Sequence, residues 1–406
     1  MTIRTIGRLT LSSGILIACA GTAAAQEGAQ QSIPIGEADL YPAIRIDYRA
    51  DDNVGLRSRD EINGSVVIVR PELLFVANRR LLEVRAGYQG AFSQGEQNSQ
   101  DWNDHRLGVG VTAELDSRRR LTGDISLQRS HTELGTDLTR GRSDRFDEPV
   151  VFNRLSADGN FSYGAAEATG RITVGARFLL LDYTNLDEVT EGRDRRSAAS
   201  YARFGYRIGG DTRAEIEVRY KDLAYDDDRF DRDELSLLSG VSFDSSGLLS
   251  GAARIGLQRV WRDADGLEDS TVLIVEAALE YQPVDYATLT FDVSRAVDNN
   301  ARSLDATGSV ESIETRATVG WKHGWSSRIS TRTFAGVRLN EEACPVADTT
   351  TGEAGLEVGV ALRRWLSVGV NAGLESRTAD ECAGNPDSTD LEYDRTTYGL
   401  FVRATL

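Results

Sequence analysis

From Tyr41 to the last residue, apolar and polar side chains alternate within successive segments of about ten residues. The clearest examples are residues 107–115, 121–128, 213–220 and 356–374. A period of two is the signature of a β-strand whose two faces meet different surroundings. The chain contains 39 Gly and a single Met, which also favours strands over long helices. We therefore expect an all-β protein.

The alternating segments number about eighteen. Their approximate centres are Ile46, Val69, Arg85, Val111, Ile125, Leu155, Val174, Arg203, Ile216, Ser239, Ile255, Val275, Phe291, Arg316, Thr333, Val358, Val370 and Leu400. Connections after every second segment are short, as at residues 78–80, 116–119 and 209–212. The other connections are longer and more acidic, as at residues 94–104, 133–149 and 378–390. This parity predicts one antiparallel transmembrane β-barrel with short periplasmic turns and longer extracellular loops.

After residue 25, the chain has no apolar stretch near the ~20 residues that a membrane helix needs. A membrane protein of this sequence must therefore span the bilayer with strands. In lipid, only a closed barrel satisfies every backbone group of a sheet. The apolar members of each segment should face lipid and the polar members a hydrated lumen. Barrels of roughly 16 to 18 strands leave an aqueous channel.

Candidate pore-lining residues are the charged and amide side chains at the polar positions. They are Arg45, Asp47, Arg49, Glu83, Arg85, Asp124, Arg171, Arg177, Glu215, Glu217, Arg219, Glu276, Glu280, Glu314, Arg316, Arg328, Arg332, Arg338, Asn371 and Glu375. A purely structural alternative is that opposite charges in this set pair across neighbouring strands.

The N-terminal residues predict export. Arg4 and Arg8 precede an apolar stretch, and three alanines precede Gln26, as in a signal peptide covering residues 1–25. Cys19 leaves a second possibility, a lipidated terminus. Residues 26–40 are expected to be a flexible periplasmic lead, and residues 41–406 the outer-membrane barrel.

Charge and motifs exclude several functions. The formal net charge of −17 argues against nucleic acid as a partner. The three histidines, His105, His131 and His323, form no metal-binding or catalytic spacing, so we expect no enzyme, metal or cofactor. A hydrolytic group of Ser130, His131 and Glu133 would require convergence in space that adjacency does not provide.

Two loop features have more than one interpretation. The acidic run at residues 226–233 lacks the spacing of a calcium loop, and a solvated loop is favoured over a calcium or lipopolysaccharide site. Cys344 and Cys382 fall in two long connections on the same side. In an oxidising compartment we expect them to form a disulfide.

Four short motifs resemble the putative beta-barrel porin 2 family. They are Asp51-Asp52-Asn53-Val54, Arg70-Pro71-Glu72-Leu73, residues 101–107 (Asp-Trp-Asn-Asp-His-Arg-Leu), and Arg129-Ser130-His131 with Gly135-Thr136-Asp137. The resemblance implies an outer-membrane barrel that forms the exit conduit for exopolysaccharide or capsule, together with a periplasmic polysaccharide-export protein.

The leading hypothesis is therefore an outer-membrane pore for polysaccharide export. One alternative is a general or substrate-selective porin for small solutes, and another is a structural or adhesive barrel with a closed interior. The expected partners are outer-membrane lipid and lipopolysaccharide, the polysaccharide-export protein, and the barrel-assembly machinery. That machinery would recognise the alternating C-terminal segment at residues 398–406.

Overall fold

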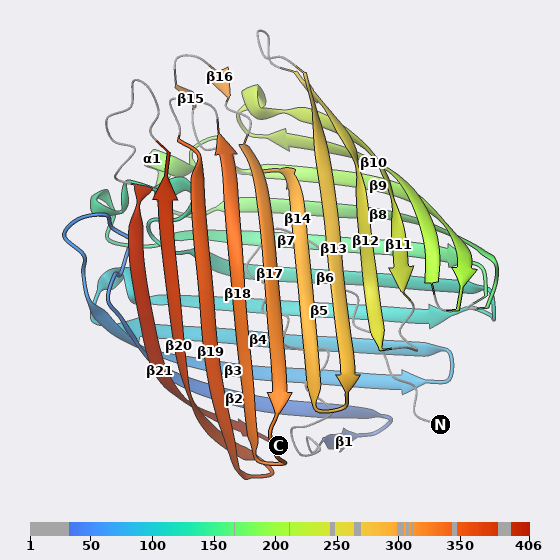
Figure 1. The fold of residues 1–406 in the computed structure, drawn as a ribbon, viewed down its shortest axis with the longest axis horizontal. Coiled ribbons are helices and arrows are strands. Elements are labelled where there is room, and N and C mark those ends of the chain that lie inside the picture. The colour runs from blue at the N-terminus through green and yellow to red at the C-terminus, as the bar shows by residue number, and fades with distance from the viewer. Residues whose placement is uncertain are drawn as a thin grey trace.

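The computed structural model describes residues 32–165, 167–210, 212–243, 248–263, 269–298, 304–305, 308–309, 312–342, 347–380 and 391–406. Within them, one sheet of 19 antiparallel strands includes a short strand, β1 (Ile33–Ile35), which lies outside the barrel and pairs only with β2. The other 18 strands form a closed barrel (Figure 1).

The barrel strands follow one another in chain order. They are β2 (Ala38–Asp51), β3 (Gly64–Arg79), β4 (Leu82–Gly95), β5 (Trp102–Glu114), β6 (Arg119–Thr132), β7 (Val150–Tyr163), β8 (Gly170–Tyr183), β9 (Arg195–Gly209), β10 (Thr212–Tyr225), β11 (Arg232–Phe243), β12 (Leu249–Arg262), β13 (Ser270–Val284), β14 (Ala287–Val297), β17 (Ser312–Gly324), β18 (Ile329–Glu342), β19 (Thr349–Arg363), β20 (Leu366–Ala379) and β21 (Tyr393–Thr405). Each expected centre falls inside its own strand, which confirms the predicted strand count.

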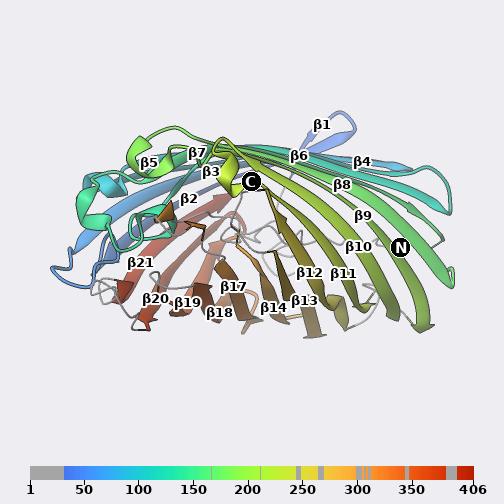
Figure 2. The ribbon, with the colours of Figure 1, turned by 90° about the horizontal axis from the view of Figure 1, so that it is seen from above.

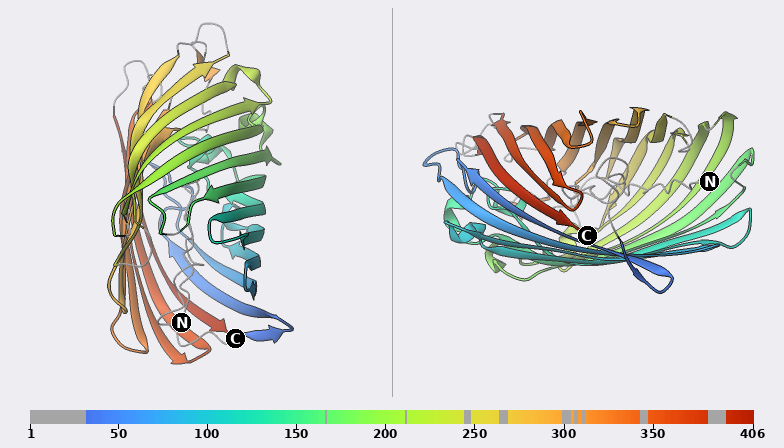
Figure 3. Two further views of the ribbon diagram at one scale, coloured as in Figure 1. Left: turned by 90° about the vertical axis from the view of Figure 1, so that its right-hand side faces the viewer. Right: turned by 90° about the horizontal axis from the view of Figure 1, so that it is seen from below.

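Closure of the barrel joins its first and last strands. β2 pairs with β21 in antiparallel register, with Arg45 opposite Arg403 and Asp47 opposite Phe401. The barrel is flattened in cross-section (Figure 2). Viewed perpendicular to its flat sides, the strands of the front wall cross those of the back wall (Figure 1). The views from the side and from below show the same continuous wall (Figure 3).

The connections alternate in length as expected. Residues 80–81 join β3 to β4, and residues 115–118 join β5 to β6. In the second turn, the Asp116 carboxylate accepts the backbone N–H groups of Arg118 and Arg119 at 2.8 Å each. At the opposite end, residues 52–63 join β2 to β3, and residues 133–149 join β6 to β7. The long connection between β14 and β17 contains the two-residue strands β15 (Leu304–Asp305) and β16 (Gly308–Ser309).

One face of the sheet is apolar and exposed. Along β5 and β6, Leu107, Val109, Ile125 and Leu127 expose 51 to 57% of their surface, which is the pattern of side chains that contact lipid. The residues between them point to the other face, which encloses the lumen. In the part of the chain that the structure describes, no helix is long and apolar enough to cross a bilayer.

One expected boundary differs from the structure. The sheet begins before Tyr41, because β1 and the first residues of β2 lie within the expected lead of residues 26–40. The signal segment, Cys19, Cys344 and Cys382 lie outside the described residues.

Candidate functional site

The candidate pore-lining residues share one face of the sheet, with one exception. All except Arg328 lie within strands, at positions that alternate with the exposed apolar side chains. Arg328 lies instead in the short turn before β18 and is exposed. A turn residue has no fixed barrel face, so assigning Arg328 to the lumen was wrong.

Many of these charges pair, although often not with the nearest strand. Arg219 on β10 donates to Glu217 on its own strand at 2.6 Å and to Glu276 on β13 at 2.7 Å. Arg45 on β2 reaches Glu357 on β19 at 2.8 Å. The pairs Arg219–Glu276 and Arg45–Glu357 span intervening strands, because side chains converge on the concave side of a curved wall. Pairing between neighbouring strands therefore describes only part of the network.

Some lumen-face positions are apolar, which the alternation did not predict. Val66 and Ile68 on β3, and Leu238 and Ile274 on β11 and β13, are at most 3% exposed. They occupy positions of the same parity as the paired charges. The lumen face is therefore a mixture of ion pairs and buried apolar contacts.

The extracellular end is crossed by two loops, named here loop A (residues 52–63) and loop B (residues 133–149). Exposed loops are normally solvated, yet Asn53 and Leu56 of loop A and Leu134 and Thr139 of loop B are 0 to 4% exposed. A small cavity of about 10 Å³ lies between these loops and the wall, lined in part by Asp51. That volume suits at most one water molecule.

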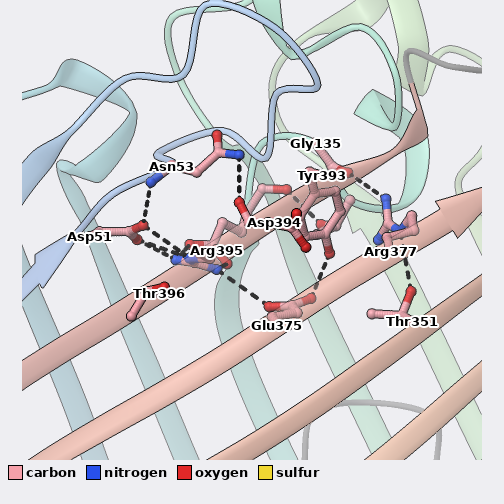
Figure 4. Close-up of polar contacts among 12 residues, drawn as sticks. Asp51, Asn53, Gly135, Thr351, Glu375, Arg377, Tyr393, Asp394, Arg395 and Thr396 are labelled. Carbon is pink, nitrogen blue, oxygen red and sulfur yellow. Dashed lines mark hydrogen bonds and ion pairs between the residues drawn. The ribbon is translucent and has the colours of Figure 1, made fainter.

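Arg395 on β21 is the centre of the contacts that hold loop B. Its guanidinium donates to the Asp51 carboxylate at 2.5 to 3.1 Å and to the Glu133 carboxylate at 2.7 and 3.1 Å. The Glu375 carboxylate on β20 lies 3.7 Å from the Arg395 guanidinium and accepts the Tyr393 hydroxyl at 2.6 Å (Figure 4). Arg395 thus joins β2, β21 and loop B at one point, called here the latch (Arg395, Asp51 and Glu133).

Two further arginines hold loop B to the wall. Arg377 on β20 donates to the backbone carbonyl of Gly135 at 3.3 Å and to Thr351 Oγ1 at 3.2 Å (Figure 4). In the other direction, Arg140 of loop B donates to Glu342 on β18 at 3.4 Å. Strands β2 to β5 and β21 lie between β6 and β20 in the barrel. Loop B must therefore cross the mouth to make these contacts.

Loop A is anchored by the Asn53 side chain. The Asn53 amide donates to the carbonyls of Arg57 at 2.8 Å and Asp394 at 2.9 Å, and its oxygen accepts the N–H of Arg57. Its backbone N–H donates to Asp51 at 3.1 Å (Figure 4). Both hydrogen-bonding ends of a fully buried amide are satisfied, as burial requires. The same residue thus orders loop A and touches the latch.

Backbone strain is concentrated in the two loops. Leu56 and Asp60 in loop A and Asp137 in loop B have φ values of 52°, 53° and 40°. Residues other than glycine avoid this left-handed region, at a cost of about 1 kcal/mol or more each. Tertiary contacts therefore impose these loop conformations.

Glu133 is ionised in the latch. Burial by itself would raise the pKa of Glu133, but the charges of Arg395, Arg49 and His131 outweigh it and lower the pKa to about 2. The side chain keeps 42% of its surface exposed, so the contact with Arg395 is partly solvated. Partly solvated ion pairs are individually weak. The Glu133–Arg395 contact can therefore hold at neutral pH and still break when another force acts on loop B.

Ser130 and His131 do not approach each other as a hydrolytic pair requires. The Ser130 hydroxyl donates to one oxygen of Asp104 at 3.0 Å, and His131 Nδ1 lies 2.9 Å from the other oxygen. The His131 ring stacks on Trp102 at 4.1 Å between centroids. These contacts fix the outer ends of β5 and β6. Among the residues that the structure describes, no three acidic, histidine or cysteine side chains gather around a possible metal position.

The candidate list drawn from the sequence missed the latch itself. Asp51 is the last residue of β2 and Glu133 follows β6, while Arg395 lies in β21 before the alternating segment recognised at residues 398–406. Asp51 and Glu133 did appear in or beside short motifs, but nothing in those motifs indicated Arg395 as their partner.

Comparison with known proteins gives the following. A family model described as putative beta-barrel porin 2 matches residues 29–404. No curated protein matches the chain. The chain is similar in structure to the outer membrane protein OpdK of Pseudomonas aeruginosa, at 12% identity, covering 91% of this chain and 99% of that one with a TM-score of 0.44.

Two other solved structures give similar values. The outer membrane channel DcaP of Acinetobacter baumannii is 11% identical, with 91% and 97% of the two chains covered and a TM-score of 0.44. A BenF-like porin from Pseudomonas fluorescens Pf-5 is 12% identical, with 92% and 100% covered and a TM-score of 0.45.

Proposed function

Because this chain belongs to the putative beta-barrel porin 2 family, and is therefore a porin-like channel of the outer membrane, we propose that it is a gated exit conduit for a polysaccharide. The observation that supports a gate is the latch, in which Arg395 holds loop B across the mouth. In this proposal, loops A and B are the gate and the lumen is the path.

A polymer conduit has two conflicting requirements. It needs a bore wide enough for a hydrated chain, which about 18 strands can supply. It must also stay closed between export events, because an open bore of that width would leak solutes. Loop B meets the second requirement through several polar contacts, of which the partly solvated one between Glu133 and Arg395 is individually weak. A periplasmic export protein bound to the short turns is the partner that we propose to deliver the chain.

A substrate-selective porin for small solutes is the second candidate. Loop B is held at Glu133, Gly135 and Arg140, by contacts with three different parts of the wall. If loop B never leaves the mouth, only small solutes could pass beside it. The third candidate, a closed structural barrel, would conduct no ions even after the latch is removed.

The direct test is conductance of the purified protein in planar bilayers. We expect small, infrequent current steps for the wild type and much larger steps for Arg395→Ala, because loop B loses its contact with the latch. Arg229→Ala is the matched control, since it removes an exposed arginine that pairs, within the described residues, with Asp227 of its own loop. Equal conductance of wild type and Arg395→Ala would contradict the gate, and an absence of steps in both would favour the closed barrel.

Passage of polymer separates export from small-solute uptake. Liposomes that carry Arg395→Ala should release an entrapped neutral dextran, while those carrying the wild type should retain it. In the source bacterium, deletion of the gene should abolish surface polysaccharide and leave polymer in the periplasm. Unchanged surface polysaccharide would contradict the export role.

A further inference from the structure

A row of arginines lies on the lumen face just inside the mouth. Arg106 on β5 is opposite Gln128 on β6, which is opposite Arg154 on β7. The row continues from Arg154 through Leu181 on β8 to Arg195 on β9. Neighbouring strands are about 4.8 Å apart, so the arginines follow one another at about 10 Å. Each alternates with a lipid-facing residue such as Leu107, so all three point into the lumen.

Among the described residues, the charges nearest the middle arginine of the row, Arg154, are not carboxylates. The charges that act on the Arg154 guanidinium are those of Arg195 and Arg106, which are also positive. Arg154 Nε is buried and has no hydrogen-bond partner among the described residues. Asp104, two residues before Arg106, is already bonded to Ser130 and His131. In a chain with a net charge of −17, such a basic row is not a consequence of composition.

The surroundings of the row are suited to a sugar chain. The Tyr183 hydroxyl bonds to Arg195, and the Arg195 guanidinium lies 5.9 Å from the centre of the Tyr225 ring. One layer further in, Ser126 and Ser156 are hydrogen-bonded to each other at 2.7 Å on the same face. Guanidinium groups bind carboxylate, sulfate or phosphate through two parallel N–H bonds. Hydroxyl and amide groups beside them can bind sugar hydroxyls.

We propose that Arg106, Arg154 and Arg195 form a binding site for the anionic groups of an acidic polysaccharide as it reaches the outer mouth. The proposal rests on the export function above and adds the chemical class of the substrate. Regular spacing along the wall favours a polymer, because successive charged sugars can occupy successive arginines. Loop B contributes an acidic residue, Asp137, whose charge acts on Tyr183 beside the row. Opening of the gate would therefore also remove a negative charge from the site.

Calorimetry on the full chain in detergent tests this site without requiring transport. The probes are hexagalacturonate, the galacturonate monomer and neutral maltohexaose. We expect hexagalacturonate to bind most tightly, and its affinity to fall about tenfold or more in the double variant Arg106→Gln/Arg154→Gln, because two charged hydrogen-bonding groups are lost. Arg195 is left unchanged because it bonds to Tyr183, and its replacement would break that contact as well as remove a charge.

Arg120→Gln is the matched control. Arg120 has the same lumen-face parity on β6 but lies at the periplasmic end, paired with Glu114 at 2.5 Å. It should bind hexagalacturonate as the wild type does, and heat-modifiable migration on gels shows that each variant is folded. Equal affinity for hexagalacturonate and maltohexaose, or no loss in the double variant, would overturn the site. A monomer that binds as tightly as the hexamer would overturn the polymer assignment.

The two proposals can fail separately. Binding that depends on Arg106 and Arg154, without any latch-dependent conductance, would leave the anion site standing and remove the export gate. Latch-dependent release of dextran, without preference for hexagalacturonate, would retain the conduit and remove the acidic substrate.

Discussion

Gly135 shows how one residue can set the state of the mouth. Its φ of +81° lies in the left-handed region, its N–H donates to Thr139 at 3.1 Å, and its carbonyl accepts Arg377. A Cβ at this position would lie 2.3 Å from the carbonyl oxygen of Gly55. Loop A and loop B thus touch through backbone, which only glycine permits here.

Replacing Gly135 by alanine should displace loop B and leave the barrel intact. We expect Gly135→Ala to conduct in larger steps than the wild type in planar bilayers, with unchanged heat-modifiable migration. Gly36→Ala is the control, because Gly36 has a φ of +67° but no atom within 4 Å of an added Cβ. Both variants carry the backbone penalty of about 1 kcal/mol, and only the first has the clash. Similar conductance in the two variants would count against the contact.

The depressed pKa of Glu133 predicts how the latch responds to acid. A carboxylate whose pKa is lowered in the folded state stabilises that state above its ordinary value of 4.5, and this contribution is lost as pH falls through about 2. Wild-type conductance should therefore stay constant from neutral pH down to about 4.5 and rise only near pH 2. Glu133→Gln, which cannot titrate at this position, should lack the acid transition. A rise in wild-type current already between pH 7 and pH 5 would contradict this assignment.

At the scale of the strand, alternation separates two environments. Ile125 on β6 exposes 57% of its surface on the apolar face, while the next residue, Ser126, bonds to Ser156 on the lumen face. An arginine placed among lipid chains near the middle of the bilayer costs about 2 to 4 kcal/mol. The same side chain in a hydrated lumen has a much smaller cost.

Ile125→Arg should therefore lower the free energy of unfolding by about 2 kcal/mol or more, and Ser126→Arg by less than half of that. Urea unfolding in lipid vesicles, followed by tryptophan fluorescence, measures both. The reverse order of the two variants would indicate that the faces have been assigned to the wrong sides.

The strands could be predicted because their signal is local. Alternation over several residues indicates which face of a strand contacts water and which face is apolar, and each segment can be interpreted without the others. β1 was missed because three residues are too few to show a period. Arg328 was assigned a face because alternation was extended into a turn, where side-chain direction no longer follows the period of two.

At the scale of the whole molecule, the barrel depends on the pairing of β2 with β21. These strands are the most distant in the chain, and their backbone groups would be unpaired in lipid without each other. A chain that ends at residue 392 lacks β21 and leaves β2 and β20 as open edges. We expect it to show no heat-modifiable band and to remain outside the membrane fraction. A folded, membrane-inserted truncated chain would show that closure is not required.

The sequence by itself determined the all-β architecture, the number of barrel strands and the alternation of turns and loops, because these follow from periodicity between near neighbours. Only the tertiary structure decided which distant residues meet. Arg395 and Glu133 are 262 positions apart, and Arg140 and Glu342 are 202 apart. Their contacts depend on barrel closure and on the path of loop B across the mouth. The alternation within a strand predicts neither barrel closure nor the path of loop B, since both arise from the curvature and register of the complete sheet.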